Sequence, residues 1–95
     1  MSAEAHPIAK FRVGIIYQTA NARAEVPFDD IVLGIRRHQA CDWGDVDADD
    51  RQRNDCALKK GTRLVSVYRS SAGVKFYIIT EADRSLTTVL LPSDY

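Results

Sequence analysis

This sequence has no excess charge of either sign, because 13 lysines and arginines are balanced by 13 aspartates and glutamates over its 95 residues. A general binder of nucleic acids or of membrane surfaces normally carries a basic excess, so the balance argues against both classes. No apolar run approaches the roughly 18 residues that span a bilayer, and we expect no membrane partner. The sequence is typical of a small soluble globular domain.

Cysteine and histidine are scarce, since the chain has only Cys41, Cys56, His6 and His38. A zinc site needs four ligands and usually a tight cysteine pair, which these spacings do not provide. We therefore expect no metal and no cofactor, with both cysteines as small core residues and His38 as a solvated charge at the end of a helix. The chain also lacks a glycine-rich phosphate loop and a nucleophile-elbow motif, so we expect a protein that is not an enzyme.

The first residues show neither the basic start nor the apolar core of a secretory signal. We therefore expect a cytoplasmic protein whose cysteines are reduced thiols. Residues 1–9 are polar and are expected to form a flexible N-terminus, and residues 10–95 a single domain.

The last third of the chain predicts a β-meander. Three runs rich in β-branched and aromatic residues, 63–68, 74–80 and 87–92, are separated by short turn signals. Residues 11–17 form a further β-prone run that is able to add a fourth strand. Val74, Phe76 and Ile78 are expected to share one face, with these cross-strand neighbours: Val65, Val67, Val89 and Leu91.

Two helices are predicted, over 28–40 and 46–60, together with a single helical turn behind Thr19. Asp45 is the expected N-cap of the second long helix, and Gly61 stands where a left-handed C-terminal cap is needed. The predicted fold is α+β, with a three- or four-stranded antiparallel sheet whose one face is covered by the two helices.

An acidic segment is the strongest candidate for a binding site. It places five carboxylates within nine residues: Asp42, Asp45, Asp47, Asp49 and Asp50. The spacing imitates the opening of a calcium loop, but the glycine and the bidentate glutamate of such a loop are missing, which argues against calcium. Two interpretations stay open, a helix N-terminus stabilised by negative charge and a patch that meets a basic partner.

Three other residues are candidates for partner binding. Trp43 either fills the core or anchors a partner. Asp83 and Arg84 lie in a charged turn, where Asp83 either bonds the turn backbone or joins Arg84 in recognition. A hydrolase that uses Glu81 and Asp83 is a weaker alternative, supported only by the presence of two carboxylates.

Residues 37–95 also contain a series of short sequence motifs in a fixed order. They are Arg37–Gln39, Asp42–Asp45, Asn54–Asp55, Ala57–Leu58, Gly61, Ser66–Tyr68, Lys75–Phe76, Ile78–Ser85, Thr87–Pro92 and Tyr95. In these motifs the chain resembles a family of small bacterial proteins encoded on plasmids and integrative conjugative elements, many labelled "plasmid-related" and some labelled as a type I restriction subunit. The N-terminal third matches this family poorly, and the family carries no agreed activity or catalytic residue. The resemblance implies a mobile-element protein that works inside a bacterium.

The expected function is inhibition of a host defence complex, of the anti-CRISPR or anti-restriction kind, through a surface that includes the acidic segment. The partner is then a protein complex whose basic surface normally holds nucleic acid. The rival hypothesis is a nucleic-acid-binding regulator of a plasmid or integrative element, and the oligomeric state stays open. The phosphate contacts of such a regulator would be Arg36, Arg37, Arg51, Arg53, Lys59, Lys60 and Arg84.

Overall fold

A computed structural model describes residues 9–95, so the expectation for a flexible N-terminus falls almost wholly outside the described residues. Within them the elements are β1 (Ile15–Gln18), α1 (Ala20–Glu25), α2 (Phe28–Gln39), α3 (Ala48–Lys60), β2 (Leu64–Arg69), β3 (Lys75–Thr80), β4 (Leu86–Leu90) and a 3₁₀ turn, η2 (Pro92–Asp94). The α+β class is confirmed. No helix of this part of the chain is long and apolar enough to cross a membrane.

The sheet is mixed, which corrects the expectation of a purely antiparallel one. Its strand order is β1-β4-β3-β2, and the predicted meander β2-β3-β4 is antiparallel. The added strand β1 runs parallel to β4, with Ile15 beside Leu86 and Gln18 beside Val89. Short turns impose antiparallel pairing on the meander, whereas three helices and two strands separate β1 from β4 and leave its direction unconstrained by any turn.

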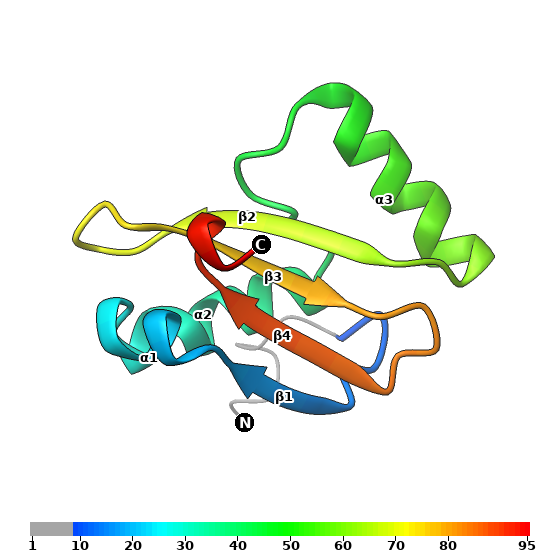
Figure 1. The fold of residues 1–95 in the computed structure, drawn as a ribbon. Coiled ribbons are helices and arrows are strands. Elements are labelled where there is room, and N and C mark those ends of the chain that lie inside the picture. Colours follow the sequence, from blue (N-terminus) through cyan, green and yellow to red (C-terminus); the bar gives the residue numbers. More distant parts are fainter. Residues whose placement is uncertain (1–8) are drawn as a thin grey trace, which may run out of the picture.

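One face of the sheet packs against α2, which lies behind the strands in Figure 1. Phe76, Ile78 and Val89 are buried there together with Ile31 of α2. Gly34 lets the helix approach closely, because a Cβ at this position would lie 3.0 Å from Ile78 Cδ1 and 3.3 Å from the Phe76 ring. The glycine that weakens the helix by propensity thus improves its packing.

The expected cross-strand neighbours are only partly right. Ile78 lies between Ser66 and Val89, so Val89 shares its face as predicted. Val65 and Val67 pair with Ile79 and Tyr77 instead and lie on the opposite face. A shift of one residue moves every side chain of a strand to the other face, and here the polar Ser66 faces the core.

The sequence predicted that both long helices cover the same face, but this is wrong for α3. Helix α3 lies beyond the edge strand β2 (Figure 1). It is polar nearly all round and buries only Asn54 and Ala57. Its N-cap is Asp47 rather than Asp45, because the Asp47 side chain accepts from the Asp50 N–H (2.8 Å), whereas the Asp45 N–H donates to Val67 O (2.7 Å). The predicted caps at Thr19 and Gly61 are confirmed, Gly61 having a φ of 73°.

Candidate functional site

The acidic segment leads from the edge of the sheet into α3. Gly44 bridges Val67 of β2 in parallel, with the Val67 N–H donating to Trp43 O (3.0 Å). A Cβ at Gly44 would lie 2.0 Å from Val67 O, and its φ is 77°, so only glycine fits here without strain. The bridge therefore holds the carboxylates of this segment on a fixed frame.

Three of the five carboxylates lie in ion pairs with arginines. Asp42 accepts from Arg37 Nε (2.7 Å), and this bond holds the pKa of Asp42 below its usual value. Asp50 accepts from Arg53 Nη1 at 2.8 Å. These pairs lower the net negative charge of the segment but add little to stability, since exposed ion pairs contribute at most about 1 kcal/mol.

Asp45, Asp47 and Asp49 are exposed, as Asp42 is. Asp47 caps α3 by accepting from the Asp50 N–H (2.8 Å), and Asp45 lies 3.6 Å from Arg69 Nε. For Asp49 no ion pair occurs within residues 9–95. Both interpretations of the segment thus have a structural counterpart, a capped helix start and an exposed acidic surface.

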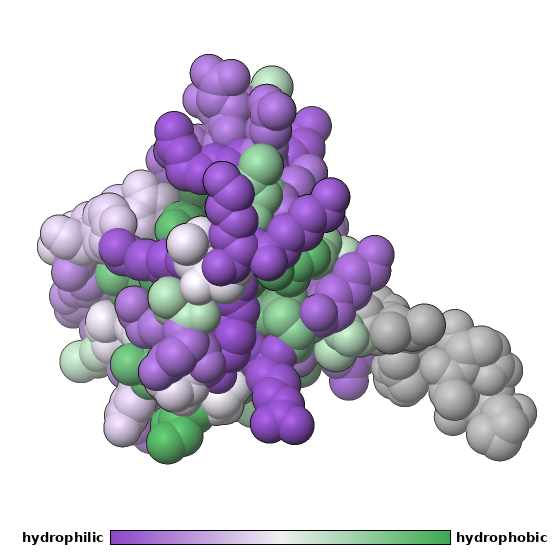
Figure 2. Space-filling model, turned by 90° about the vertical axis from the view of Figure 1, so that its right-hand side faces the viewer, coloured by the Kyte–Doolittle hydropathy of each residue, from purple (hydrophilic) through white to green (hydrophobic). Residues whose placement is uncertain are grey.

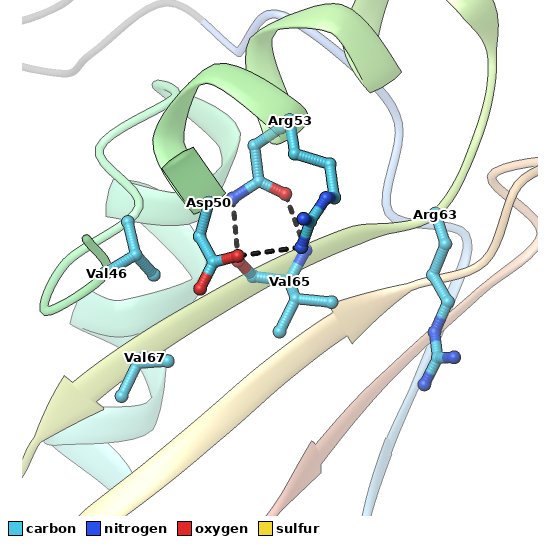
Figure 3. Close-up of a pocket in the computed structure, with 7 residues that line it drawn as sticks. Val46, Asp50, Arg53, Arg63, Val65 and Val67 are labelled. Atoms are coloured by element: carbon cyan, nitrogen blue, oxygen red, sulfur yellow. Dashed lines mark hydrogen bonds and ion pairs between the residues drawn. The ribbon is translucent and has the colours of Figure 1, made fainter. Parts of the chain in front are cut away.

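A small hollow lies beneath α3, and Asp50 is the carboxylate of the acidic segment that lines it (Figure 3). Val46, Val65 and Val67 supply its apolar lining, and the Asp50–Arg53 pair stands at its side, with Arg63 projecting separately. Its volume is about 190 Å³, below the 300–1,000 Å³ typical of small-molecule sites. The hollow is the size for a single side chain of a partner rather than for a whole metabolite.

Trp43 belongs to the core, one of the two alternatives that the sequence left open. Its side chain is 2% exposed, donates from Nε1 to Asp55 Oδ1 (3.1 Å) and lies against Phe11 with ring centroids 6.2 Å apart. A buried indole does not present itself to a partner, so Trp43 supports the acidic segment from beneath.

Asp83 and Arg84 serve the turn in which they lie. Asp83 accepts from the Ser85 N–H (3.0 Å) and hydroxyl (2.6 Å), which lowers the pKa of Asp83. The Arg84 guanidinium donates to the carbonyl oxygens of Thr62 (2.6 Å) and Ala57 (3.2 Å), at the C-terminal end of α3. Arg84 thereby ties the β3–β4 turn to α3, a role that the sequence did not reveal.

His38 is not a solvated charge, as the sequence predicted, but is fully buried. Its Nδ1 lies 2.5 Å from Ser66 Oγ, and its Nε2 lies 2.9 Å from Thr80 Oγ1. Thr80 bonds Thr87 (2.7 Å), and the Thr87 hydroxyl donates to Val13 O (2.7 Å). Each hydroxyl has one proton to donate, and Thr87 gives its proton to Val13 O. Thr80 therefore donates to Thr87 and accepts from His38 Nε2–H. Nε2 is thus the protonated nitrogen, and Ser66 donates to Nδ1.

Burial, and secondarily the charge of Arg84, lowers the pKa of His38 to about 3. The imidazole is therefore neutral at physiological pH, and it orders a polar layer inside the core. Ser66, Thr80 and Thr87 are each fully buried, so the Ser–His contact is closed to a substrate. Alternating polar residues in the strands, Ser66 and Thr80, were the signal in the sequence that a polar partner lies between them.

The cysteines are both free thiols, and Cys56 is exposed rather than part of the core. Cys41 is half-buried, and burial raises the pKa of its thiol. Within the part of the chain that the structure describes, no group of three or more His, Cys, Asp or Glu side chains is able to hold a metal ion.

Three of the seven cations of the nucleic-acid hypothesis already have partners inside the protein. Arg37 and Arg53 pair with aspartates, and Arg84 bonds carbonyl oxygens. Figure 2, which views the molecule from the right-hand side of Figure 1, shows a mostly hydrophilic face with α3 at the top. Arg37, Arg53 and Arg84 are therefore less available for phosphate contacts than a free basic stripe would be.

Comparison with known proteins does not assign this site. No family model matches the sequence. Neither a curated protein nor a solved structure matches the chain.

Proposed function

We propose that this protein is a small non-enzymatic inhibitor that binds a host nucleic-acid-processing complex, of the anti-restriction or anti-CRISPR kind. The binding surface consists of the exposed carboxylates Asp45, Asp47 and Asp49 and the hollow beneath α3. Both the choice of partner and the bacterial setting rest on the resemblance to mobile-element proteins.

The observation that carries this proposal is that Val46, which lines a hollow of one-side-chain size together with Val65 and Val67, stands between the exposed Asp45 and Asp47 in the chain. Interfaces of this kind combine a buried anchor residue with charges at the rim, which guide encounter and orientation. The bridge from Gly44 to Val67 and the cap at Asp47 hold the carboxylates in place before binding. A pre-ordered surface loses less entropy on association than a mobile loop does.

The test is a competition between this protein and DNA for a purified type I restriction enzyme or CRISPR effector, followed by gel shift. We expect the triple variant Asp45→Asn, Asp47→Asn, Asp49→Asn to need at least about tenfold more protein for the same inhibition, because rim charges mainly control association. Asparagine at position 47 keeps the helix cap, so the fold is preserved. The matched control, Asp29→Asn, removes an exposed carboxylate from α2 and should leave inhibition unchanged.

Equal inhibition by the triple variant would contradict the proposed surface. Direct binding to DNA with a steep salt dependence in a filter-binding titration would favour the nucleic-acid-binding regulator instead. In that case Arg51, Lys59 and Lys60 of α3 are the first phosphate contacts to replace.

A further inference from the structure

Among residues 9–95, the edge strand β1 has no neighbouring strand on its outer side. Its Ile15 N–H donates to Ser85 O (3.0 Å), and the Thr19 N–H that follows the strand donates to Val89 O (3.0 Å). Because backbone groups of successive residues in a strand point in opposite directions, Ile16 and Gln18 direct their N–H and C=O groups away from β4. Since β1 is the terminal strand of the sheet formed by residues 9–95, these groups lie at an open edge.

An apolar groove runs beside this edge, on the side occupied by α2. Ile16 and Gln18 form its floor, and Phe28, Val32, Ile35 and Arg36 of α2 belong to its wall. The volume is about 450 Å³. Phe28 is 69% exposed and Ile16 44% exposed, so apolar surface of the wall and of the floor faces solvent.

Large exposed apolar side chains gather around this edge. Ile15 is 64% exposed and Tyr17 56% exposed, on the opposite face of β1 from the groove. Natural proteins usually cover or charge an edge of this kind, because it is a template for another strand. The four residues of β1 contain no charge and no proline.

We propose that β1 and this groove bind an extended peptide segment of another protein, which adds to the sheet as a fifth strand. The backbone of the peptide pairs with Ile16 and Gln18, and every second side chain falls on the α2 side and enters the groove. Arg36, the charged residue of the groove wall, is exposed and selects an acidic side chain or a terminal carboxylate.

A second copy of this chain fits the groove less well than a peptide of this pattern. Antiparallel pairing of two β1 strands brings a second Ile16 and Gln18 to the α2 side. These side chains supply no anion for Arg36 and only one further apolar group for a groove of about 450 Å³. A peptide with large apolar residues at alternate positions and an acidic residue at one end satisfies both requirements.

The experiment measures fluorescence anisotropy of a labelled octapeptide with leucine and threonine in alternation and aspartate at one end. We expect saturable binding, weakened about tenfold by Ile16→Pro, which removes an outward N–H but none that the sheet itself uses. The Arg36 side chain is exposed, so the Arg36→Glu variant should fold normally. This variant should prefer the peptide that has lysine in place of aspartate. N-methylation of the peptide at one alternating set of residues should abolish binding, whereas methylation of the other set should not.

Strand addition would be overturned if both N-methylated peptides bind, and also if both fail to bind. A concentration-dependent dimer that Ile16→Pro dissociates would assign the edge to a second copy and overturn the proposal. Absence of binding to the aspartate peptide and to the lysine peptide alike would also overturn it. The Asp49→Asn variant should bind the peptide normally, so failure here is distinct from failure of the proposed inhibitor surface.

Discussion

The two edges of the sheet are treated in opposite ways. At β2, the outward backbone groups of Val65 pair with the Asn54 side chain, at 3.1 Å and 2.8 Å. Those of Val67 pair with Trp43 and Asp45. At β1 the corresponding groups of Ile16 and Gln18 meet no further strand among residues 9–95.

This difference separates a structural role from a binding role. A polar helix with little apolar surface, such as α3, is held against the domain chiefly because it satisfies backbone groups that burial would otherwise leave unpaired. The open edge at β1 instead carries apolar side chains that the domain does not use. Changes that remove the backbone partners of β2 should therefore affect folding, whereas changes at the open edge of β1 should affect peptide binding.

The largest effect is expected at the bridge that closes the β2 edge. Gly44→Ala places a Cβ 2.0 Å from Val67 O at a φ of 77°, and should lower the free energy of unfolding by about 3 kcal/mol. Urea denaturation measures this loss of stability. The control Gly73→Ala has a similar φ of 84° but no atom within 4 Å, so a loss of about 1 kcal/mol is expected. Equal losses would show that backbone strain alone, and not the closed edge, matters.

A smaller effect is expected from Asn54→Ala, which leaves the N–H and C=O groups of Val65 without their partner. Two lost hydrogen bonds at a partly buried site should lower the free energy of unfolding by about 2 kcal/mol. The exposed Gln52 of the same helix provides the control, since Gln52→Ala should change stability by less than about 0.5 kcal/mol. A stable Asn54→Ala protein would mean that α3 does not close this edge.

Protonation of His38 should weaken the chain of hydrogen bonds that runs from Ser66 of β2 through Thr80 and Thr87 to Val13, just before β1. The folded pKa of about 3 lies below the ordinary value of 6.5, so the unfolded state binds the proton more readily between these values. The contribution is complete above pH 6.5 and is lost as pH falls, by about 1.4 kcal/mol per pH unit.

The measurement is denaturant unfolding at pH 7.5 and pH 5.5, compared with His38→Gln, which does not titrate. The pH dependence specific to His38 should be missing from the variant. Identical pH profiles for the two proteins would show that the imidazole is not held neutral in the fold.

The smallest effect on stability is expected at the open edge. Tyr17→Thr replaces an aromatic residue by a β-branched one, which also favours strands, at an exposed position, so the free energy of unfolding should change by less than about 0.5 kcal/mol. Thermal unfolding and light scattering measure it, and association at high concentration should fall because apolar surface is removed. A large loss of stability would show that β1 is part of the core rather than a binding edge.

The candidate site was predictable only in part. The exposed carboxylates of the acidic segment are visible in the sequence, because clustered charge of one sign stays in solvent. The pairing of Asp42 with Arg37 and of Asp50 with Arg53 depends on side-chain direction at a helix end and a helix start. The hollow joins Val46 to Val65 and Val67, residues about twenty apart whose meeting no local pattern shows. Val65 and Val67 were expected in the core, because a one-residue register shift leaves the apolar pattern of 63–68 equally plausible.

By itself the sequence determined what depends on near neighbours: the caps at Thr19 and Gly61, the long helix from Phe28, and the three strands joined by short turns. Propensities, turn residues and helix-end charges act over a few residues, so their effects can be predicted from the sequence alone. Only the tertiary structure decided that β1 runs parallel to β4, that α3 lies along an edge, and that His38 is buried and neutral. Each of these depends on partners distant in the chain, as His38 and Thr80 are, and the energy of such contacts exists only once the sheet has formed.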